Sequence, residues 1–416
     1  METLFTRVAG LDLHQKTVVA CVRITGADGK AVEEIRTFGT MTGELLALSD
    51  WLTQQRVTHI AMESTGVLWK PVWNILDGRT DWTLLLVNPR ELKQVPGRKS
   101  DVKDSQWIAH LLACGLLRAS FVPERGQRDL RDLTRTRAVL TDEHTRTVNR
   151  LHKILQDANI KLTSVATDIL GKSGRDMLTE LMNGERDVEV LADLARGRLR
   201  KKIPQLKQAL QGRMTKHHEF LLEQIFMHLT HLEEQLAAFD TRIEEALRPF
   251  ASTELRERLD AIPGINQKTI DVIVSELGVD MSQFPSSSHL ASWAGLCPGN
   301  EESAGKRSRS RTTKGNVWLR RALSESAWAA AHAKDSYFAA QYRRLSARRG
   351  KKRAIVAVAH ALLVVIYHLL KDPKLKYQDL GVHYFDTLEP DRLRRHLVKR
   401  LEELGFDVTL TQHVAA

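Results

Sequence analysis

The chain has 416 residues, which is long enough for two or three domains, each with its own core. A hydrophobic content of 42% and a charged content of 27% are ordinary for a folded protein, and the formal net charge is +11. Its three cysteines, Cys21, Cys114 and Cys297, lie far apart without metal-type or redox-type spacing, which argues against a disulfide scaffold and suits a reducing cytoplasm.

The first 120 residues alternate strand and helix signals. Strands are predicted at 7–13, 16–24, 31–38, 58–62 and 82–87, and helices at 42–54, 65–76 and 104–117. Thr42 is the expected N-cap of the first helix. Three strands in hairpin order followed by two crossover units are the element order of an RNase H-like α/β fold.

Four carboxylates stand out by their position in this order. Asp12 lies in the apolar first strand, Glu63 ends the fourth strand, and Asp101 and Asp104 stand three residues apart where the last helix begins. In an RNase H-like topology these places converge on one sheet edge, where the acids would repel unless a divalent cation bound there. Mg²⁺ suits such oxygen ligands and phosphates, with Mn²⁺ as a possible substitute. Taken singly, Asp101 and Asp104 could instead serve the helix N-terminus, Asp12 a turn and Glu63 the surface.

The middle of the chain, residues 126–250, carries little strand signal. An apolar seam repeats at alternating spacings of three and four residues and comprises Leu222, Ile225, Leu229, Leu232, Leu236, Phe239, Ile243 and Ala246. This heptad pattern predicts a coiled-coil arm, with the segment 130–155 as a second long helix and candidate antiparallel partner. A helix buried in an ordinary bundle fits the same spacing.

The last part, residues 251–416, reads as mainly helical. A Pro-Gly turn at 263–264 joins two helices, the second over 268–277, in a hairpin that could direct N–H groups at a phosphate or be a plain helical hairpin. Further helices are predicted at 318–333, at 354–370 and, with an apolar face, at 390–404. The apolar segment 354–370 is marginal for a membrane span and more natural as a buried helix, and the N-terminus lacks the order of a signal peptide. We therefore expect no membrane attachment.

Positive charge is concentrated in this last part. Residues 306–353 hold 15 basic and 2 acidic residues, a net charge of +13, which is the footprint expected for a nucleic-acid backbone, although a solubilising face would look alike. The block begins in the stretch GNEESAGKRSRSRTTKGN, residues 299–316, which contains the hydroxyls of Ser303, Ser308 and Ser310. No histidine lies near them in sequence, so chemistry alone does not select a nucleophile.

Several of these stretches resemble the DEDD transposases of the insertion-sequence one-hundred-ten family. The N-terminal match rests on GLDLHQKT, AMESTG and VNPRELKQVPGRKSDVKDSQWIAHLL, and the C-terminal match on LDAIPGINQKTIDVIVSELG and LASWAGLCPGNEESAGKRSRSRTTKGNVWLRRAL. The resemblance covers residues 7–118 and about 255–370. It implies a RuvC-like domain with a coiled coil, joined to a second domain that supplies a serine nucleophile.

On that pattern Asp12, Glu63, Asp101 and Asp104 form the metal-binding tetrad, and Ser303 is the nucleophile. We expect three domains: a RuvC-like domain at 1–125, a helical coiled-coil region at 126–250 and a C-terminal transposase domain at 251–416. The residues expected to bind nucleic acid are Lys306, Arg307, Arg309, Arg311, Lys314, Arg320 and Arg321.

The resemblance implies an enzyme that cleaves and rejoins the DNA of a mobile element. It would act in the bacterial cytoplasm, at the nucleoid, as a dimer or tetramer guided by a noncoding bridge RNA. A metal-dependent endonuclease or junction resolvase, in which Ser303 only lines the DNA, is the alternative. A non-catalytic nucleic-acid scaffold is a further one. The sequence leaves the role of residues 371–416 open.

Overall fold

The structure is a computed structural model that describes residues 3–64, 66–79, 81–89, 92, 104–298, 302–303, 306–307, 312, 314–388 and 390–411. The chain divides into two compact units, Met1–Pro123 and Glu124–Ala416. The regions 126–250 and 251–416 both lie in the second unit, and the predicted division between them stays a prediction.

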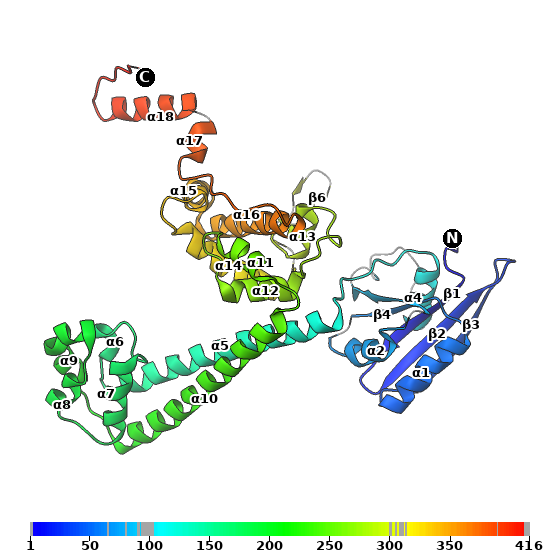
Figure 1. Ribbon diagram of the computed structural model, residues 1–416, viewed down its shortest axis with the longest axis horizontal. Coiled ribbons are helices and arrows are strands. Elements are labelled where there is room, and N and C mark those ends of the chain that lie inside the picture. Colours follow the sequence, from blue (N-terminus) through cyan, green and yellow to red (C-terminus); the bar gives the residue numbers. More distant parts are fainter. Residues whose placement is uncertain are drawn as a thin grey trace. The chain divides into compact units, whose positions relative to one another are not determined.

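The first unit is built on one mixed β-sheet (Figure 1). Its strands are β1 (Arg7–Leu13), β2 (Thr17–Thr25), β3 (Ala31–Gly39), β4 (His59–Glu63) and β5 (Thr83–Val87). They are ordered β3-β2-β1-β4-β5, with β2 antiparallel to both β1 and β3 and β4 parallel to both β1 and β5. This topology fits the RNase H-like α/β fold expected from the element order.

The two faces of the sheet have separate cores. On one face Ala9, Leu11 and Leu13 of β1 pack with buried residues of α1 (Thr42–Gln54) and α2 (Trp69–Leu76). Val8 belongs to the opposite core, together with buried residues of α4 (Asp104–Ala113). Because side chains alternate along a strand, the even-numbered positions of β1 face α4.

Three local predictions in this unit are wrong. The helix predicted from residue 65 begins at Trp69, as α2. Thr42 is the first helical residue of α1 and not its cap; the N-cap is Met41, which makes no side-chain hydrogen bond. Helix α4 ends at Ala113 and not near 117, because Gly115 takes a positive φ of 68° and lies against the Leu4 side chain. A left-handed glycine at this point is a common helix stop.

The second unit begins with two long helices that lie side by side (Figure 1). They are α5 (Arg125–Asp157) and α10 (Lys216–Leu247). Ion pairs join Arg137 to Asp240 at 3.0 Å and His218 to Asp157 at 2.9 Å, so the two helices run antiparallel. The predicted partner helix is therefore confirmed, and every residue of the heptad seam is buried or half-buried. The supercoil itself stays a prediction.

Short helices fill the connection between α5 and α10 (Figure 1). They are α6 (Leu162–Val165), α7 (Lys172–Met182), α8 (Val188–Asp193), the 3₁₀ helix η1 (Gly197–Lys202) and α9 (Ile203–Leu210). Their apolar residues form one core with the adjoining ends of the long helices, including Leu151, Leu155 and Leu222. This cluster stabilises the end of the helical pair by burying apolar surface.

The C-terminal part of the second unit is a helical bundle. Its helices are α11 (Thr253–Asp260), α12 (Gln267–Leu277), α13 (Ser287–Trp293), α14 (Val317–Ala331), α15 (Tyr337–Arg349) and α16 (Lys351–Lys371). Within the described chain, α16 is the one helix long and apolar enough to cross a membrane. It packs against α13, α14 and α15 with nine of its residues buried, which is the environment of a core helix. This agrees with the buried helix predicted from the sequence.

The chain then continues to two final helices, α17 (Tyr384–Leu388) and α18 (Pro390–Glu403). Phe385 of α17 stacks on Tyr337 of α15, with ring centroids 5.3 Å apart. The leucines of the predicted apolar face of α18 remain largely exposed, among them Leu397 and Leu401.

Candidate active site

Two of the predicted catalytic acids lie on neighbouring strands of the sheet. Strands β1 and β4 pair in parallel with Leu11 opposite Met62, so Asp12 and Glu63 occupy the next positions on adjacent strands. Asp12 stands two residues after Gly10. Glu63 likewise stands two residues after Ala61, which is buried in the core beneath α4. Because alternate residues share a face, both carboxylates lie on the face that α4 covers, at the carboxyl ends of their strands.

Helix α4 begins over the same edge. The backbone N–H groups of Leu4 and Phe5, just before β1, donate to the carbonyl of Ala113 at the end of α4. Gly10, further along β1, lies against the first turns of the helix, where a Cβ would stand 2.2 Å from the Ser105 carbonyl oxygen. Helix α4 therefore runs antiparallel to β1 and presents its N-terminal residue, Asp104, at the carboxyl end of that strand.

The surroundings of Asp12 include one basic group. The His14 Nε2 atom lies 3.1 Å from the Asp12 Oδ2 atom, and the Asp12 side chain is only 22% exposed. Asp101, the fourth predicted acid, lies outside the described residues. Among the residues that the structure describes, no three His, Cys, Asp or Glu side chains gather closely enough to hold a metal ion. The register places Asp12 and Glu63 on adjacent strands, and Asp104 begins the helix that packs on Gly10 of the same face.

In the second unit, Ser303 lies in a short β-hairpin and not in an irregular loop. Strands β6 (Glu302–Ser303) and β7 (Lys306–Arg307) are antiparallel, and Ser303 pairs with Lys306 across the two intervening residues. A further antiparallel bridge joins Pro298 to Thr312. The rival serines Ser308 and Ser310 lie outside the described residues, as do Arg309 and Arg311.

The base of this segment is fixed by close backbone contact. Gly315 packs on Ala294 and Gly295, since a Cβ at Gly315 would lie 2.1 Å from the Gly295 nitrogen. The next residue, Asn316, donates its backbone N–H to the Trp293 carbonyl at 3.3 Å and caps α14 by accepting from the N–H groups of Trp318 and Leu319. The hairpin therefore rises from a base held between α13 and α14.

Glu276 connects that base to the long helix α5. Its side chain is completely buried and accepts two hydrogen bonds from the Arg135 guanidinium, at 2.7 and 2.8 Å. The Asn316 side-chain amide donates to the same carboxylate at 2.7 Å. The Arg131 guanidinium lies 3.5 Å away, and burial lowers its pKa to about 10 while Glu276 opposes that shift. Such charge-assisted bonds hold α5, α12 and α14 in one arrangement.

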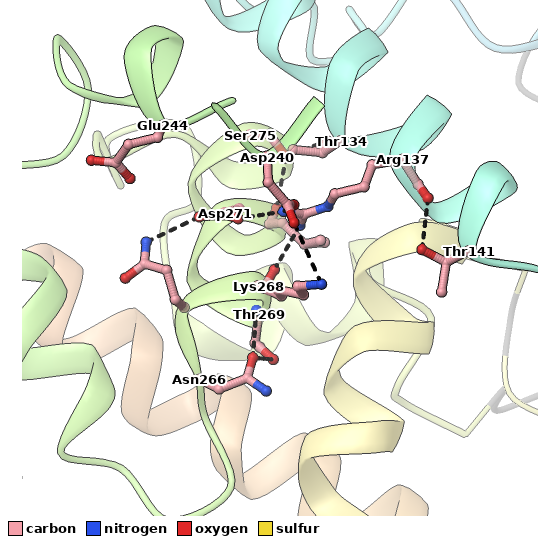
Figure 2. A network of polar contacts seen from close by, with 12 residues as sticks. Thr134, Arg137, Thr141, Asp240, Glu244, Asn266, Lys268, Thr269, Asp271 and Ser275 are labelled. Atoms are coloured by element: carbon pink, nitrogen blue, oxygen red, sulfur yellow. Dashed lines mark hydrogen bonds and ion pairs between the residues drawn. The ribbon is translucent and has the colours of Figure 1, made fainter. Parts of the chain in front are cut away.

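Figure 2 shows a second polar network, which includes Arg137 and Asp271. The buried Arg137 side chain of α5 donates to Asp271 of α12 at 2.7 Å and to Asp240 of α10 at 3.0 Å. The N-terminus of α12 is capped by Asn266, whose side-chain oxygen accepts from the Thr269 N–H at 2.9 Å. A cleft of about 260 Å³ adjoins these groups, and it is lined by residues of α5, α12, α14 and the turn before α12.

Comparison with known proteins decides what these elements belong to. Residues 9–160 match a transposase family model, and residues 256–343 match the model of the IS116/IS110/IS902 family of transposases. The chain belongs to this transposase family. It is a DNA transposase and recombinase, as the resemblance implied.

Two relatives extend this result. The transposase is 26% identical over 296 residues to a protein of Streptomyces coelicolor named "Insertion element IS110 uncharacterized 43.6 kDa protein", covering 67% of this chain and 72% of the relative. It is 29% identical over 149 residues to the "Pilin gene-inverting protein" of Moraxella bovis, covering 34% of this chain and 45% of that relative. The second match spans less than half of the relative.

The basic residues of the transposase fall into two groups. In the first group, the arginine side chains form hydrogen bonds and ion pairs within the protein. Arg321, for example, donates two hydrogen bonds to Asp142, at 2.6 and 2.7 Å, and one to Glu325. The side chains of Lys306 and Arg307 are not described, Arg320 makes contacts within the protein, and Lys314 is exposed. Arg321 thus has a structural role in joining α14 to α5, and its three engaged bonds leave it less free to contact a phosphate.

The second group surrounds α15. Eight exposed cations lie between residues 334 and 353, and none of them makes an ion pair with any residue that the structure describes. We name them the α15 basic surface: Lys334, Arg343, Arg344, Arg348, Arg349, Lys351, Lys352 and Arg353. The sequence indicated this block by its charge, but only the structure shows that these cations form no ion pair with the described carboxylates.

Proposed function

We propose that this transposase cleaves and rejoins the DNA of a mobile element through a covalent link to Ser303, assisted by the carboxylates of Asp12, Glu63, Asp101 and Asp104. The observation that supports the proposal most directly is the sheet edge, where Asp12, Glu63 and the start of α4 meet. A magnesium or manganese ion bound by these acids would supply neutralisation of the charge on a phosphodiester.

The proposed covalent step is a transesterification. The Ser303 Oγ attacks the phosphorus atom and forms a phosphoserine ester, while the bond from phosphorus to the leaving sugar oxygen breaks. The proton of the serine hydroxyl passes to that departing oxygen, which becomes a strand-end hydroxyl. No water is consumed, so attack by another strand-end hydroxyl on the phosphoserine re-forms a phosphodiester and releases the serine. The number of phosphate esters is conserved in the exchange.

The position of Ser303 supports this role. A serine hydroxyl needs activation and a fixed position to act as a nucleophile. Ser303 is the last paired residue of β6, immediately before the two-residue connection to β7. The base of this β-hairpin is anchored through Gly315, Asn316 and Glu276. A serine on an anchored hairpin is better positioned for attack than one on an unconstrained segment.

We further propose that DNA and a noncoding guide RNA from the element bind the basic residues of the second unit. The α15 basic surface and the residues Lys306, Arg307, Arg309, Arg311, Lys314 and Arg320 would contact phosphates, and Arg321 would contribute only if it released its carboxylate partners. Phosphate contacts of this kind provide affinity and little sequence information. A dimer or tetramer acting in the cytoplasm, at the nucleoid, remains part of this proposal and rests on the family resemblance.

An adduct-trapping assay tests the covalent step. The full chain is incubated with the element's DNA ends and flanking RNA, with and without Mg²⁺, and then denatured to reveal covalently bound DNA. We expect Ser303→Ala to lose both cleavage and adduct, Asp104→Asn to lose both, and Ser308→Ala, the matched control, to keep both.

Two other results would change the conclusion. Cleavage that persists in Ser303→Ala without an adduct would favour a metal-dependent endonuclease or junction resolvase. Activity unchanged by Asp104→Asn and by Asp101→Asn would show that the sheet edge has no catalytic role.

A further inference from the structure

An exposed group of aromatic rings lies between α14 and α15. Trp328 of α14 is 55% exposed, whereas the other seven tryptophans of the chain are buried or half-buried. Its ring centroid lies 4.6 Å from that of His332, one helical turn further along, and the His332 ring lies 6.0 Å from that of Tyr342 in α15. The three residues form one aromatic cluster on the surface of the second unit.

The position of the His332 ring is fixed by the backbone. Its Nδ1 atom lies 2.7 Å from the Trp328 carbonyl oxygen, and because a carbonyl oxygen only accepts, Nδ1–H donates to it. The ring therefore holds its place against the indole without a ligand. A preformed cluster loses less conformational entropy on binding than mobile side chains would.

The charge around the cluster indicates what it binds. His332 precedes Lys334 by two residues, and Tyr342 is followed directly by Arg343 and Arg344, so the rings adjoin the α15 basic surface. An aromatic surface next to cations that form no ion pair with the described residues matches the two parts of a nucleotide, a flat base and a charged phosphate. The same surface repels cationic ligands. A neutral apolar ligand would contact the rings but form no favourable interaction with the cations.

A protein partner fits this surface less well. A stable protein interface buries about 800 Å² on each partner and needs a contiguous apolar centre. Apart from Trp328, the one other largely exposed large hydrophobic residue among the described parts of α14 and α15 is Val317, near the opposite end of α14. A single indole surrounded by cations is too small for such a centre, but it matches the size of one base.

We propose that the Trp328–His332–Tyr342 cluster stacks an unpaired base of a single-stranded segment, in RNA or in DNA, while the α15 basic surface binds the neighbouring phosphates. This assignment rests on the proposed function, in which the protein binds both kinds of nucleic acid. A base within a duplex is already stacked on its neighbours and does not reach the indole face, so the cluster distinguishes single strands from duplexes.

The test compares binding of fluorescein-labelled 20-nucleotide RNA, single-stranded DNA and duplex DNA by the full-length protein. We expect Trp328→Ala to weaken single-strand binding roughly tenfold, the effect of losing one stacked base, and to leave duplex binding and its salt dependence unchanged. Trp328→Phe, which keeps an aromatic face, should restore most of the affinity. Val317→Ala, a matched control on the same helix, should bind all three probes as the wild type does. The RNA and DNA arms show which strand supplies the base.

Three outcomes would overturn the assignment. Single-strand binding by Trp328→Ala equal to that of the wild type would show that no base stacks there. An equal loss for single strands and duplex would show a general effect on affinity. A change of oligomeric state in light scattering, without a change in binding, would identify a protein interface. Trp328→Ala leaves Ser303 unchanged. If this variant still forms the covalent adduct but loses no single-strand affinity, the stacking site is refuted and the proposed function stands. A wild-type protein that binds no nucleic acid would refute both the stacking site and the proposed function.

Discussion

The buried carboxylate of Glu276 provides the sharpest test of how the second unit is held together. Replacement by alanine removes the acceptor of two hydrogen bonds from Arg135 and one from Asn316, and it removes the carboxylate 3.5 Å from Arg131. The Glu276 side chain has no solvent exposure, and the Arg131 side chain is 12% exposed. Water therefore reaches Arg131 poorly and Arg135, whose side chain is 33% exposed, only in part, so solvent does not fully replace the lost carboxylate.

Breaking a buried ion pair by removing one partner costs about 3–5 kcal/mol, because the remaining charge is left uncompensated. The second unit, Glu124–Ala416, has 293 residues, and at about 2.1 cal/mol/K of unfolding entropy per residue each kcal/mol lowers its melting temperature by about 1.6 °C. We therefore expect Glu276→Ala to lower the melting temperature of the second unit by roughly 5–8 °C. Glu276→Gln keeps an acceptor oxygen but loses the charge, so its effect should be smaller.

The measurement is thermal unfolding followed by circular dichroism at 222 nm, which reports mainly the helical second unit. The control is Glu245→Ala, since Glu245 forms an exposed i,i+3 pair with Arg242 that is worth about 0.3–0.5 kcal/mol. If Glu276→Ala melted within 2 °C of Glu245→Ala, the burial argument would be refuted. Adduct formation at a temperature where the variant remains folded should also fall, because Glu276 holds the base of the Ser303 hairpin.

Three other predictions follow from single positions. Gly10→Ala places a methyl group 2.2 Å from the Ser105 carbonyl oxygen. We expect the free energy of unfolding of the first unit, measured in urea, to fall by about 1–3 kcal/mol and DNA cleavage to decrease. Gly43→Ala is the control, since its methyl group meets open space and should change neither quantity. Burial raises the pKa of the Cys21 thiol to about 12, so little thiolate is present at pH 8. Mass spectrometry should therefore find Cys21 alkylated only after the protein is unfolded. Equal labelling of the native and unfolded protein would contradict this. Arg349→Ala should reduce the slope of log affinity for nucleic acid against log salt concentration by about 1. Arg196→Ala is the control and should leave the slope unchanged, because the Arg196 guanidinium of the wild type pairs with Asp176. Equal slopes for the two variants would exclude Arg349 as a phosphate contact.

The sequence carried the order of the elements because local periodicity reports which residues share a face. Alternation identified the strands of the first unit, and the three-four repeat identified α10 as one long helix. The sequence shows Asp12 as an acid inside an apolar strand and Glu63 as an acid at a strand end, and the sheet register places them on neighbouring strands. The chemistry that the family resemblance added, including the choice of Ser303 over its neighbours, does not follow from periodicity.

Tertiary structure alone decided which faces meet. In the sequence Glu276 is one acid near the end of a helix, and its partner Arg135 lies 141 residues away, so no local pattern joins them. Gly10 lies in a predicted strand, and only the structure shows α4 packed on it. Trp328 lies in the predicted helix 318–333, and only the structure shows that its side chain is 55% exposed. Periodicity shows that residues share a face, but burial depends on distant segments, and the sequence does not state which face those segments cover.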